Sequence, residues 1–222
     1  MAERALPEGL ELRQTPRGLA LVGGGMELVP DFEDMLPRVR PGALQRELLV
    51  RAARCKGAQD APFLAVDATA GLGEDAFLLA AAGFEVLLFE RDPVIAALLS
   101  DALDRARDAP ATAPVACRMR LAGFDSVEGL SRLPRRPDVV YLDPMFPERR
   151  KSAAVKKKFQ LLHHLERPCE DAATLMEAAC AARPRKIVVK RPVKGPFLAE
   201  VKPSYQVVGK AVRYDVIVPA HP

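Results

Sequence analysis

From residue 62 onward, the apolar positions of the chain fall into short continuous runs separated by longer segments with helical spacing. The runs predict five strands, at residues 63–66, 85–89, 117–121, 139–142 and 186–190. The intervening segments predict helices that begin near residues 75, 93 and 170, and Asp92 followed by Pro93 is a typical helix start. Strands that are apolar on both sides and alternate with helices indicate a parallel sheet covered on both faces.

The C-terminal end of the chain breaks this alternation. Residues 205–209 and 212–218 are two further strand patterns with almost nothing between them. They predict a hairpin in which at least one strand runs antiparallel to the rest of the sheet. Residues 109–114, with the sequence Ala-Pro-Ala-Thr-Ala-Pro, are expected to form an exposed and mobile connector.

The first 60 residues follow a different pattern. We expect two short strands, at residues 10–12 and 19–22, and then a loop punctuated by prolines up to Pro41. Apolar positions at helical spacing predict a helix over about residues 42–54. The predicted organisation is therefore an N-terminal extension, residues 1–60, packed on a main domain that comprises residues 61–222.

Length and composition narrow the class of protein. A chain of 222 residues is one ordinary domain with room for a small appendage. No apolar run approaches the roughly 18 residues that a membrane span needs, and the N-terminus shows no apolar signal segment. The cysteines and histidines show no metal-ligand spacing, so we expect reduced thiols, no metal and a cytoplasmic location.

Positive charge is concentrated in one segment. The net charge is +4, but residues 148–158 carry a local charge of +5, which leaves the rest of the chain near −1. Such a cluster favours an anionic partner, in particular the phosphates of a nucleic acid, although a solvated charged surface is the alternative. The candidate phosphate contacts are Arg149, Arg150, Lys151, Lys156, Lys157, Lys158, Lys190 and Arg191.

A glycine-rich turn follows the first predicted strand of the main domain. Gly71 and Gly73 allow the backbone to turn tightly and to approach a ligand at the start of a helix. Glu90 ends the next strand, 19 residues after Gly71, where a carboxylate can accept hydrogen bonds from both hydroxyls of a ribose. This combination is typical of NAD enzymes and of S-adenosylmethionine (SAM) enzymes. The alternative is a plain tight turn with acids that cap helices.

Three carboxylates around this turn favour SAM over NAD. Asp67 lies four residues before Gly71, at a position where methyltransferases place an acid near the methionine end of the cofactor. Glu74 and Asp75 stand at the helix start, where they would repel a pyrophosphate but suit a cofactor that has no phosphate.

The third predicted strand is followed by Phe124-Asp125-Ser126, at the position where folds of this kind usually contact an adenine. The carboxylate of Asp125 can accept a hydrogen bond from the adenine amine. It can equally cap the helix that follows, and the two roles are compatible.

The fourth predicted strand ends in Asp143-Pro144-Met145-Phe146. Methyl transfer to an exocyclic amine needs acceptors aimed at its N–H groups and a base held in line with the methyl group. The carboxylate of Asp143 and the carbonyl of Pro144 can supply the acceptors, and the ring of Phe146 can stack on a base, worth about 1–3 kcal/mol. The tetrapeptide resembles the Asp/Asn-Pro-Pro-Tyr/Phe motif of amino-group methyltransferases, with Met145 in place of the second proline. A strand-end turn with an incidental aromatic residue is the alternative.

Taken together, these motifs resemble the RsmJ (YhiQ) family of small-subunit ribosomal RNA guanine-N2 methyltransferases. The resemblance covers roughly residue 62 to the C-terminus. It rests on the segments 67–77 (DATAGLGEDAF), 90–93 (ERDP), 141–147 (YLDPMFP), 151–157 (KSAAVKK) and 188–192 (VVKRP). The chain departs from the family at Glu74, where a basic residue is common, and at Asp125, where a serine is common.

The resemblance implies a class I SAM-dependent methyltransferase, which is an α/β, Rossmann-like fold with a seven-stranded, mostly parallel sheet and a C-terminal antiparallel hairpin. It implies methylation of one guanine near the 3′ end of 16S rRNA, of the guanine-1516 type, with the rRNA or the small ribosomal subunit as partner. It also implies cofactor contacts at Glu74, Asp75, Glu90, Arg91, Asp125, Ser126 and Asp143.

Three other functions stay open on the residues alone. An adenine-N6 methyltransferase acting on RNA or DNA could use the same Asp-Pro-Met-Phe segment. An NAD-dependent oxidoreductase would share the glycine-rich turn, although the sequence offers no obvious acid for hydride transfer. A non-catalytic RNA-binding or assembly factor could retain the fold and the basic segment.

Overall fold

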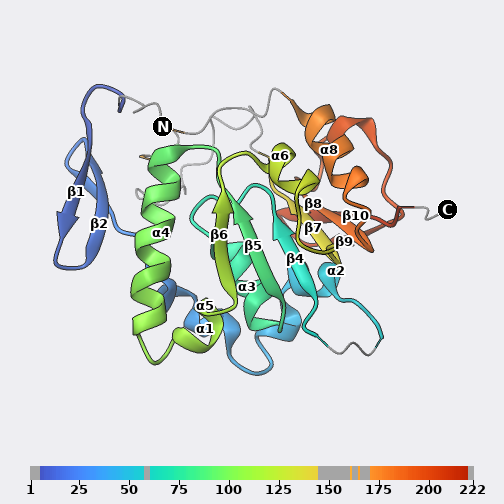
Figure 1. Cartoon of the computed structure of the whole chain (residues 1–222), viewed down its shortest axis with the longest axis horizontal. Coiled ribbons are helices and arrows are strands. Elements are labelled where there is room, and N and C mark those ends of the chain that lie inside the picture. Colours follow the sequence, from blue (N-terminus) through green and yellow to red (C-terminus); the bar gives the residue numbers. More distant parts are fainter. Residues whose placement is uncertain (1–5, 58–60, 145–160, 162–164, 166–170, 220–222) are drawn as a thin grey trace.

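The computed structural model describes residues 6–57, 61–144, 161, 165 and 171–219. Its centre is a seven-stranded sheet in the order β6-β5-β4-β7-β8-β10-β9 (Figure 1). The strands are β4 (Leu64–Asp67), β5 (Glu85–Phe89), β6 (Met119–Gly123), β7 (Val139–Leu142), β8 (Lys186–Pro192), β9 (Tyr205–Val208) and β10 (Val212–Ile217). β6, β5, β4, β7 and β8 are mutually parallel, while β10 pairs antiparallel with both β8 and β9. The sheet confirms the predicted mostly parallel arrangement with a C-terminal antiparallel hairpin.

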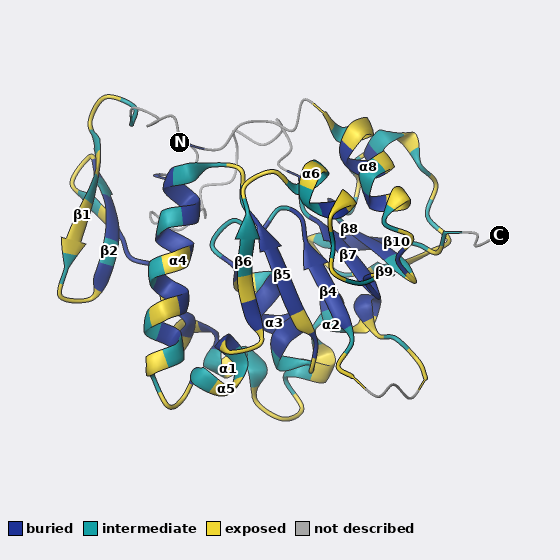
Figure 2. Ribbon diagram, viewed as in Figure 1, coloured by how far each residue is buried: buried dark blue, intermediate teal, exposed yellow. Residues whose placement is uncertain are grey.

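Helices cover both faces of this sheet, which explains why its central strands are apolar on both sides (Figure 2). Consecutive residues of β7 alternate between two hydrophobic clusters: Val139 and Tyr141 join one, and Val140 and Leu142 join the other. The first cluster includes side chains of α2 (Leu48–Ala53), α3 (Glu74–Ala81), α4 (Pro93–Asp108) and α5 (Ala113–Ala116). The second includes side chains of α6 (Ser126–Ser131), α8 (Ala172–Ala181) and the 3-10 turn η3 (Leu198–Glu200).

The N-terminal segment forms a small sheet of its own. β1 (Leu10–Thr15), β2 (Gly18–Gly23) and β3 (Met26–Leu28) pair antiparallel beside α4 (Figure 1). Two kinds of contact attach this small sheet to α4. Leu21 and Leu98 belong to the same hydrophobic cluster, and the backbone N–H of Leu19 donates to Asp101 at 3.0 Å. β3 was absent from the sequence prediction, since three residues are too short to show a periodicity.

The helix predicted over residues 42–54 is interrupted. The chain forms the 3-10 turns η1 (Phe32–Met35) and η2 (Leu44–Arg46), the short helix α1 (Leu36–Val39) and then α2 (Leu48–Ala53). The break lies at Glu47, whose backbone is extended (φ −62°, ψ 125°). Its carboxylate accepts two hydrogen bonds from the guanidinium of Arg38, at 2.9 and 2.8 Å. This tertiary contact ties η2 to α1, and the helical spacing of apolar residues could not reveal it.

The connector expected at residues 109–114 is also different from the prediction. Thr112 is fully buried, and its hydroxyl donates to the carbonyl of Ala106 at 2.7 Å. The helix α5 begins at Ala113, so β6 begins at Met119 rather than at Cys117. The hydrogen bond of the buried Thr112 hydroxyl therefore anchors this segment, although its composition resembles that of an exposed linker.

The loop after β8 is fastened by a buried arginine of β10. The Arg213 side chain pairs with Asp215, and its Nη1 donates to the carbonyls of Pro192, Val193 and Gly195 at 2.7, 2.7 and 2.9 Å. The C-terminal end of β8 is thereby held at the edge of the sheet where β4, β5 and β7 also end. Among the described helices, none has the length and apolar character required to cross a membrane.

Candidate active site

The glycine-rich turn connects β4 to α3, and both of its glycines have left-handed backbones. Gly71 has φ +54° and Gly73, which caps the N-terminus of α3, has φ +79°. The carboxylate of Glu90 at the end of β5 fastens this turn: Oε2 accepts the N–H of Gly71 and Oε1 accepts the N–H of Asp92, each at 2.8 Å. Burial raises the pKa of Glu90 to about 7. The three predicted residues Gly71, Gly73 and Glu90 thus form one connected structure.

The two glycines differ in the space around them, and this difference predicts different costs of substitution. A Cβ at Gly73 would lie 2.7 Å from Cδ1 of Leu99 and 3.1 Å from Cζ of Phe32, whereas a Cβ at Gly71 meets nothing within 4 Å. We expect Gly73→Ala to lower the free energy of unfolding by about 2–4 kcal/mol, from steric overlap and backbone strain together. Gly71→Ala, the matched control, should cost only about 1–2 kcal/mol of strain. Urea unfolding measures both, and equal costs would contradict the steric argument.

Asp67 ends β4 and is 1% exposed. Its Oδ1 accepts the N–H of Thr69 at 3.1 Å, while no described residue donates to its buried Oδ2. Burial raises the pKa of Asp67 well above its usual range, and the nearby carboxylates of Asp75 and Asp143 raise it further. An unsatisfied buried oxygen beside the glycine-rich turn fits a site that a donor group of a cofactor would complete.

A second cluster joins the ends of β7 and β8 to the first turn of α3. Nζ of Lys190 donates to Oδ2 of Asp143 and to Oδ2 of Asp75, both at 2.8 Å. The hydroxyl of Tyr141 donates to the same oxygen of Asp75 at 2.6 Å. The hydroxyl oxygen of Thr69, in the glycine-rich turn, accepts the backbone N–H of Asp143 at 2.6 Å. These bonds fix Asp143 through its main chain and through one carboxylate oxygen.

Burial and charge act against each other in this cluster. Burial lowers the pKa of Lys190, but the carboxylates of Asp75 and Asp143 outweigh it, so the net pKa is raised and the amine stays protonated. Burial raises the pKa of Asp143, and the ammonium of Lys190 opposes that rise. Burial also raises the pKa of Tyr141 well above its usual range, so its hydroxyl remains a donor. The pair of Lys190 and Asp143 is therefore a charge-assisted contact at a partly covered edge.

The remaining predicted cofactor contacts lie at the same edge of the sheet. Asp125 caps α6, because its Oδ1 accepts the N–H groups of Val127 and Glu128 at 2.9 and 3.1 Å. This is one of the two roles expected for Asp125, and the contact with an adenine stays a prediction. Phe124 is 44% exposed. Arg91 is exposed, and Ser126 is partly exposed at the start of α6.

One predicted RNA contact is buried in the structure. Arg191 is only 1% exposed, and its Nε donates to the carbonyl of Pro196 at 2.7 Å. Its contact with RNA stays a prediction. In the sequence, Lys190 and Arg191 are two adjacent basic residues with no sign that their exposure differs. In the structure their side chains face opposite sides of the sheet, because the residues of a strand alternate in direction. Lys190 reaches the predicted edge, but its ammonium is bonded to two carboxylates.

Several predicted site residues lie outside the described residues. Pro144 is described and buried. Those outside are Phe146 and the predicted phosphate contacts Arg149, Arg150, Lys151, Lys156, Lys157 and Lys158.

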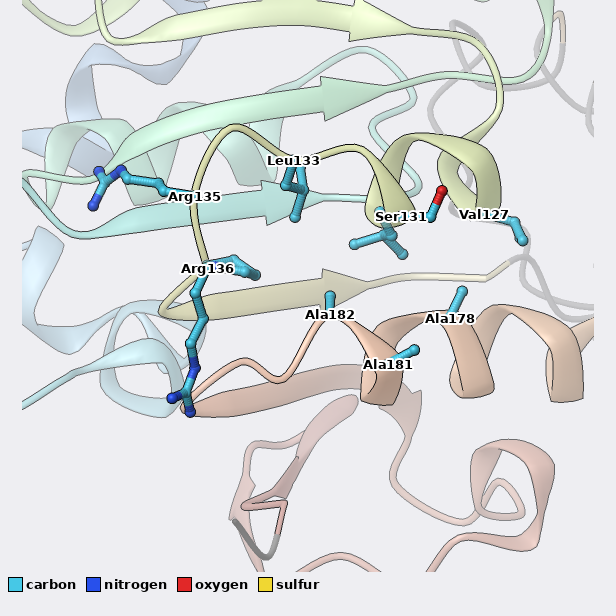
Figure 3. Close-up of a pocket in the computed structure, with 10 residues that line it drawn as sticks. Val127, Ser131, Leu133, Arg135, Arg136, Ala178, Ala181 and Ala182 are labelled. Carbon is cyan, nitrogen blue, oxygen red and sulfur yellow. The ribbon is translucent and has the colours of Figure 1, made fainter. Parts of the chain in front are cut away.

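Two cavities flank the glycine-rich turn and the sheet. One, of about 510 Å³, is lined by the segment from Leu28 to Arg38 together with Leu72 and Glu74 of the turn and α3. The other, of about 380 Å³, lies between α6 and α8, whose side chains Val127, Ser131, Ala178 and Ala181 line it (Figure 3). The second cavity contains none of the predicted site residues. The first brings the N-terminal segment to the cofactor turn, which the sequence did not predict.

Sequence reasoning did not assign site roles to Thr69 and Tyr141, and it did not predict the carboxylate partners of Lys190. A signal existed for the lysine: it ends the apolar run Ile187-Val188-Val189 of a central strand. A cation on such a strand must find carboxylates, because an unpaired buried charge is costly. No comparable signal marked Thr69, since a hydroxyl in a turn has many ordinary roles.

The strand order, the glycine-rich turn after the first parallel strand and the acid that ends the second define a class I SAM-dependent methyltransferase. The comparisons with known proteins agree. A family model described as "Putative SAM-dependent methyltransferase" matches residues 9–219. A relative from Thioalkalivibrio sulfidiphilus, named ribosomal RNA small subunit methyltransferase J, is 43% identical over 98% of this chain and 90% of its own length. The chain belongs to the family of ribosomal RNA small subunit methyltransferase J.

Other similar proteins support this assignment. A relative of the same name from Pseudomonas aeruginosa is 51% identical over 68% of this chain, and the match covers 58% of that relative's length. A solved structure of a SAM-dependent methyltransferase from Neisseria gonorrhoeae is 32% identical, with a TM-score of 0.75, over 99% of this chain and 86% of the other. The resemblance drawn from the motifs is confirmed, but the family match begins at residue 9 and not near residue 62. The N-terminal segment is therefore included in the family.

Proposed function

We propose that this protein transfers a methyl group from SAM to the exocyclic N2 of a guanine in 16S ribosomal RNA, of the guanine-1516 type. The observation that carries the proposal is the carboxylate of Asp143 at the end of β7. Its Oδ2 is held by Lys190, and its Oδ1 accepts no hydrogen bond from any described residue. In the proposed function, this second carboxylate oxygen would accept an N–H of the amine, beside a turn that suits the cofactor.

The residues present fit the cofactor. Glu90 offers a carboxylate to the ribose hydroxyls, and Asp125 offers one to the adenine amine. The unsatisfied Oδ2 of Asp67 suits the ammonium at the methionine end, and the open space at Gly71 leaves room for close approach. When bound there, SAM supplies an electrophilic methyl group on a positively charged sulfur.

The chain's own residues would prepare the amine. Asp143 accepts one N–H of the guanine amine, which turns the nitrogen lone pair toward the methyl carbon. The cofactor held there would supply the methyl carbon and retain the electron pair of its carbon–sulfur bond, while the amine would form the new nitrogen–carbon bond and lose a proton to water. The acceptor oxygen favours the transition state because positive charge grows on the nitrogen as the bond forms. A strong general base is unnecessary for this order of steps.

The substrate and its location follow from the same proposal. The basic residues from Arg149 to Lys158 would contact phosphates and position the RNA without reading its sequence. The relatives are named for an activity on small-subunit ribosomal RNA, which supports that substrate here. Reaction with rRNA or with the assembled subunit would take place in the cytoplasm.

The deciding experiment is transfer of labelled methyl from SAM to unmodified small subunits and to free 16S rRNA, followed by nucleoside mass spectrometry and mapping of the site. We expect N2-methylguanosine at a single position near the 3′ end. RNA already methylated there is the matched control and should accept no label. N6-methyladenosine would instead identify an adenine methyltransferase. RNA binding with steep salt dependence but no transfer would identify a non-catalytic factor.

A further inference from the structure

The acidic edge of the site contains one lysine, which comes from the sheet itself. Lys190 lies on β8 opposite Tyr214 of β10, and its side chain is 27% exposed. Strand alternation places it on the face of the sheet that carries Val188 and the helix α3. From there its Nζ reaches Asp75 on α3 and Asp143 beyond β7, at 2.8 Å each. One ammonium group therefore joins three elements that are far apart in the sequence.

The bonds around this lysine leave Asp143 little freedom. Its backbone N–H is bonded to Thr69, and its Oδ2 is bonded to Lys190. Asp75, the second partner of Lys190, is fixed in turn by the hydroxyl of Tyr141 at 2.6 Å. Rotation of the Asp143 carboxylate would break the contact with Lys190, so the direction of its Oδ1 is set by these contacts.

Among the described residues, the ionisable groups around Asp143 come from several elements. Asp67 on β4, Asp75 on α3 and the hydroxyls of Tyr141 and Tyr214 surround the cluster, while Lys190 and Arg191 on β8 and Arg38 on α1 contribute positive charge. Without Lys190, Asp143 would face the buried Asp67 and the carboxylate of Asp75 without the ammonium group that is bonded to it. Burial already raises its pKa, so it would take up a proton more readily.

We propose that Lys190 is a positioning residue for methyl transfer, which keeps the Asp143 carboxylate ionised and directs its Oδ1 at the amine of the substrate. This inference deepens the proposed function and rests on it. A protonated Asp143 would present a hydroxyl to the amine and lose much of its strength as an acceptor. Lys190 acts through Asp143, and neither a contact with the methyl group nor one with the RNA is required of it.

The geometry favours this role over the phosphate contact that the sequence suggested. Two of the three N–H groups of Lys190 are bonded to carboxylates, and a phosphate could take both only by breaking these contacts. Lys194, four residues further along, is exposed. It is the matched lysine for a comparison, because a phosphate-binding role would suit it better.

The test compares Lys190→Met, Lys190→Arg and Lys194→Met with the wild-type chain. The carboxyl carbon of Asp143 is followed by ¹³C NMR against pH in the protein without SAM, with its signal identified by its loss in Asp143→Asn. Lys190→Met should raise the pH at which Asp143 titrates by about 1–3 pH units, the usual effect of an adjacent opposite charge. Lys190→Arg and Lys194→Met should leave that titration within half a unit or so of the wild type.

Kinetics on rRNA supply the second reading. In Lys190→Met, we expect kcat at pH 7 to fall about 10–100-fold and to recover as the pH rises, with the KM for rRNA within about threefold of wild type. Lys190→Arg should keep the wild-type pH profile. That result would show that the positive charge at this position is what matters, and that the loss in Lys190→Met does not come from a folding defect. An unchanged Asp143 titration in Lys190→Met would overturn the inference. A change confined to the KM for rRNA would also overturn it, because that result would favour a contact between Lys190 and a phosphate.

The two proposals fail in different ways. Absence of transfer by the wild-type chain would end the proposed function, whereas the NMR titration would still show whether Lys190 controls the ionisation of Asp143. Active wild-type protein with an unperturbed Asp143 in Lys190→Met would retain the function and remove only the role of the lysine.

Discussion

Replacing Asp143 with alanine is expected to lower the single-turnover rate of methyl transfer by about 10²–10³-fold, the usual cost of removing one oriented group that stabilises developing charge. The affinity for SAM should change by no more than several-fold, because Glu90, Gly71 and Asp67 remain. Lys190 would keep its contact with Asp75, so the ammonium is not left unpaired. Rapid-quench transfer of labelled methyl and calorimetric titration of SAM measure the two quantities separately.

Asp143→Asn is the matched control for this prediction. It keeps an acceptor oxygen but loses the charge that pairs with Lys190, so we expect a transfer rate between those of the wild type and Asp143→Ala. Transfer by Asp143→Ala at close to the wild-type rate would refute the assigned acceptor. A loss of rate that came with an equal loss of SAM binding would move Asp143 from amine orientation to cofactor binding.

Glu90→Gln is expected to weaken SAM binding about 10–100-fold, which corresponds to roughly 1.5–3 kcal/mol for a hydrogen bond to a charged group. The carboxylate of Glu90 accepts an N–H with each of its oxygens. A glutamine has only one acceptor oxygen, so its amide NH₂ would face the N–H of Gly71 or of Asp92. The same substitution at Glu85, at the opposite end of β5 and paired with Arg135, is the control and should leave SAM binding unchanged.

The affinity for SAM should also depend on pH in the wild-type chain. Burial raises the pKa of Glu90 to about 7. In the proposed role, ribose hydroxyls would donate to its ionised form. The Kd for SAM should therefore rise as the pH falls below about 7, by up to tenfold for each pH unit. Glu90→Gln should remove this dependence. A wild-type Kd that is constant between pH 6 and pH 8 would show that Glu90 does not bind the cofactor in the ionised form.

The stability of the SAM-free protein should change with pH in the opposite direction. A carboxyl group whose pKa is higher in the folded chain than in the unfolded chain binds its proton more tightly when folded. Its contribution to the free energy of unfolding is present below its unfolded pKa and is lost as the pH rises through about 7. Saturating SAM, which favours the ionised form, should reduce this loss.

The central sheet was predictable because each strand satisfies its own local pattern. A short apolar run between helical segments is typical of a strand that is covered by helices on both faces. Asp92 and Pro93 likewise define the start of α4 without any distant contact. The helix over residues 42–54 was not predictable in the same way, since the break at Glu47 depends on a contact with Arg38. The buried Thr112 shows the same limit for a segment whose composition resembles a linker.

The sequence by itself determined the class of fold, the glycine-rich turn and the carboxylates that surround it, because these features are local and repeat with strand and helix spacing. It placed Asp143 at the end of a parallel strand, and so at the edge where such sheets bind ligands. Only the tertiary structure decided which charges meet there. Lys190 and Arg191 are adjacent in the chain, yet strand alternation sends one to the carboxylates of Asp75 and Asp143 and buries the other against Pro196. The electrostatic character of the site is a property of contacts between distant segments, and no local pattern encodes it.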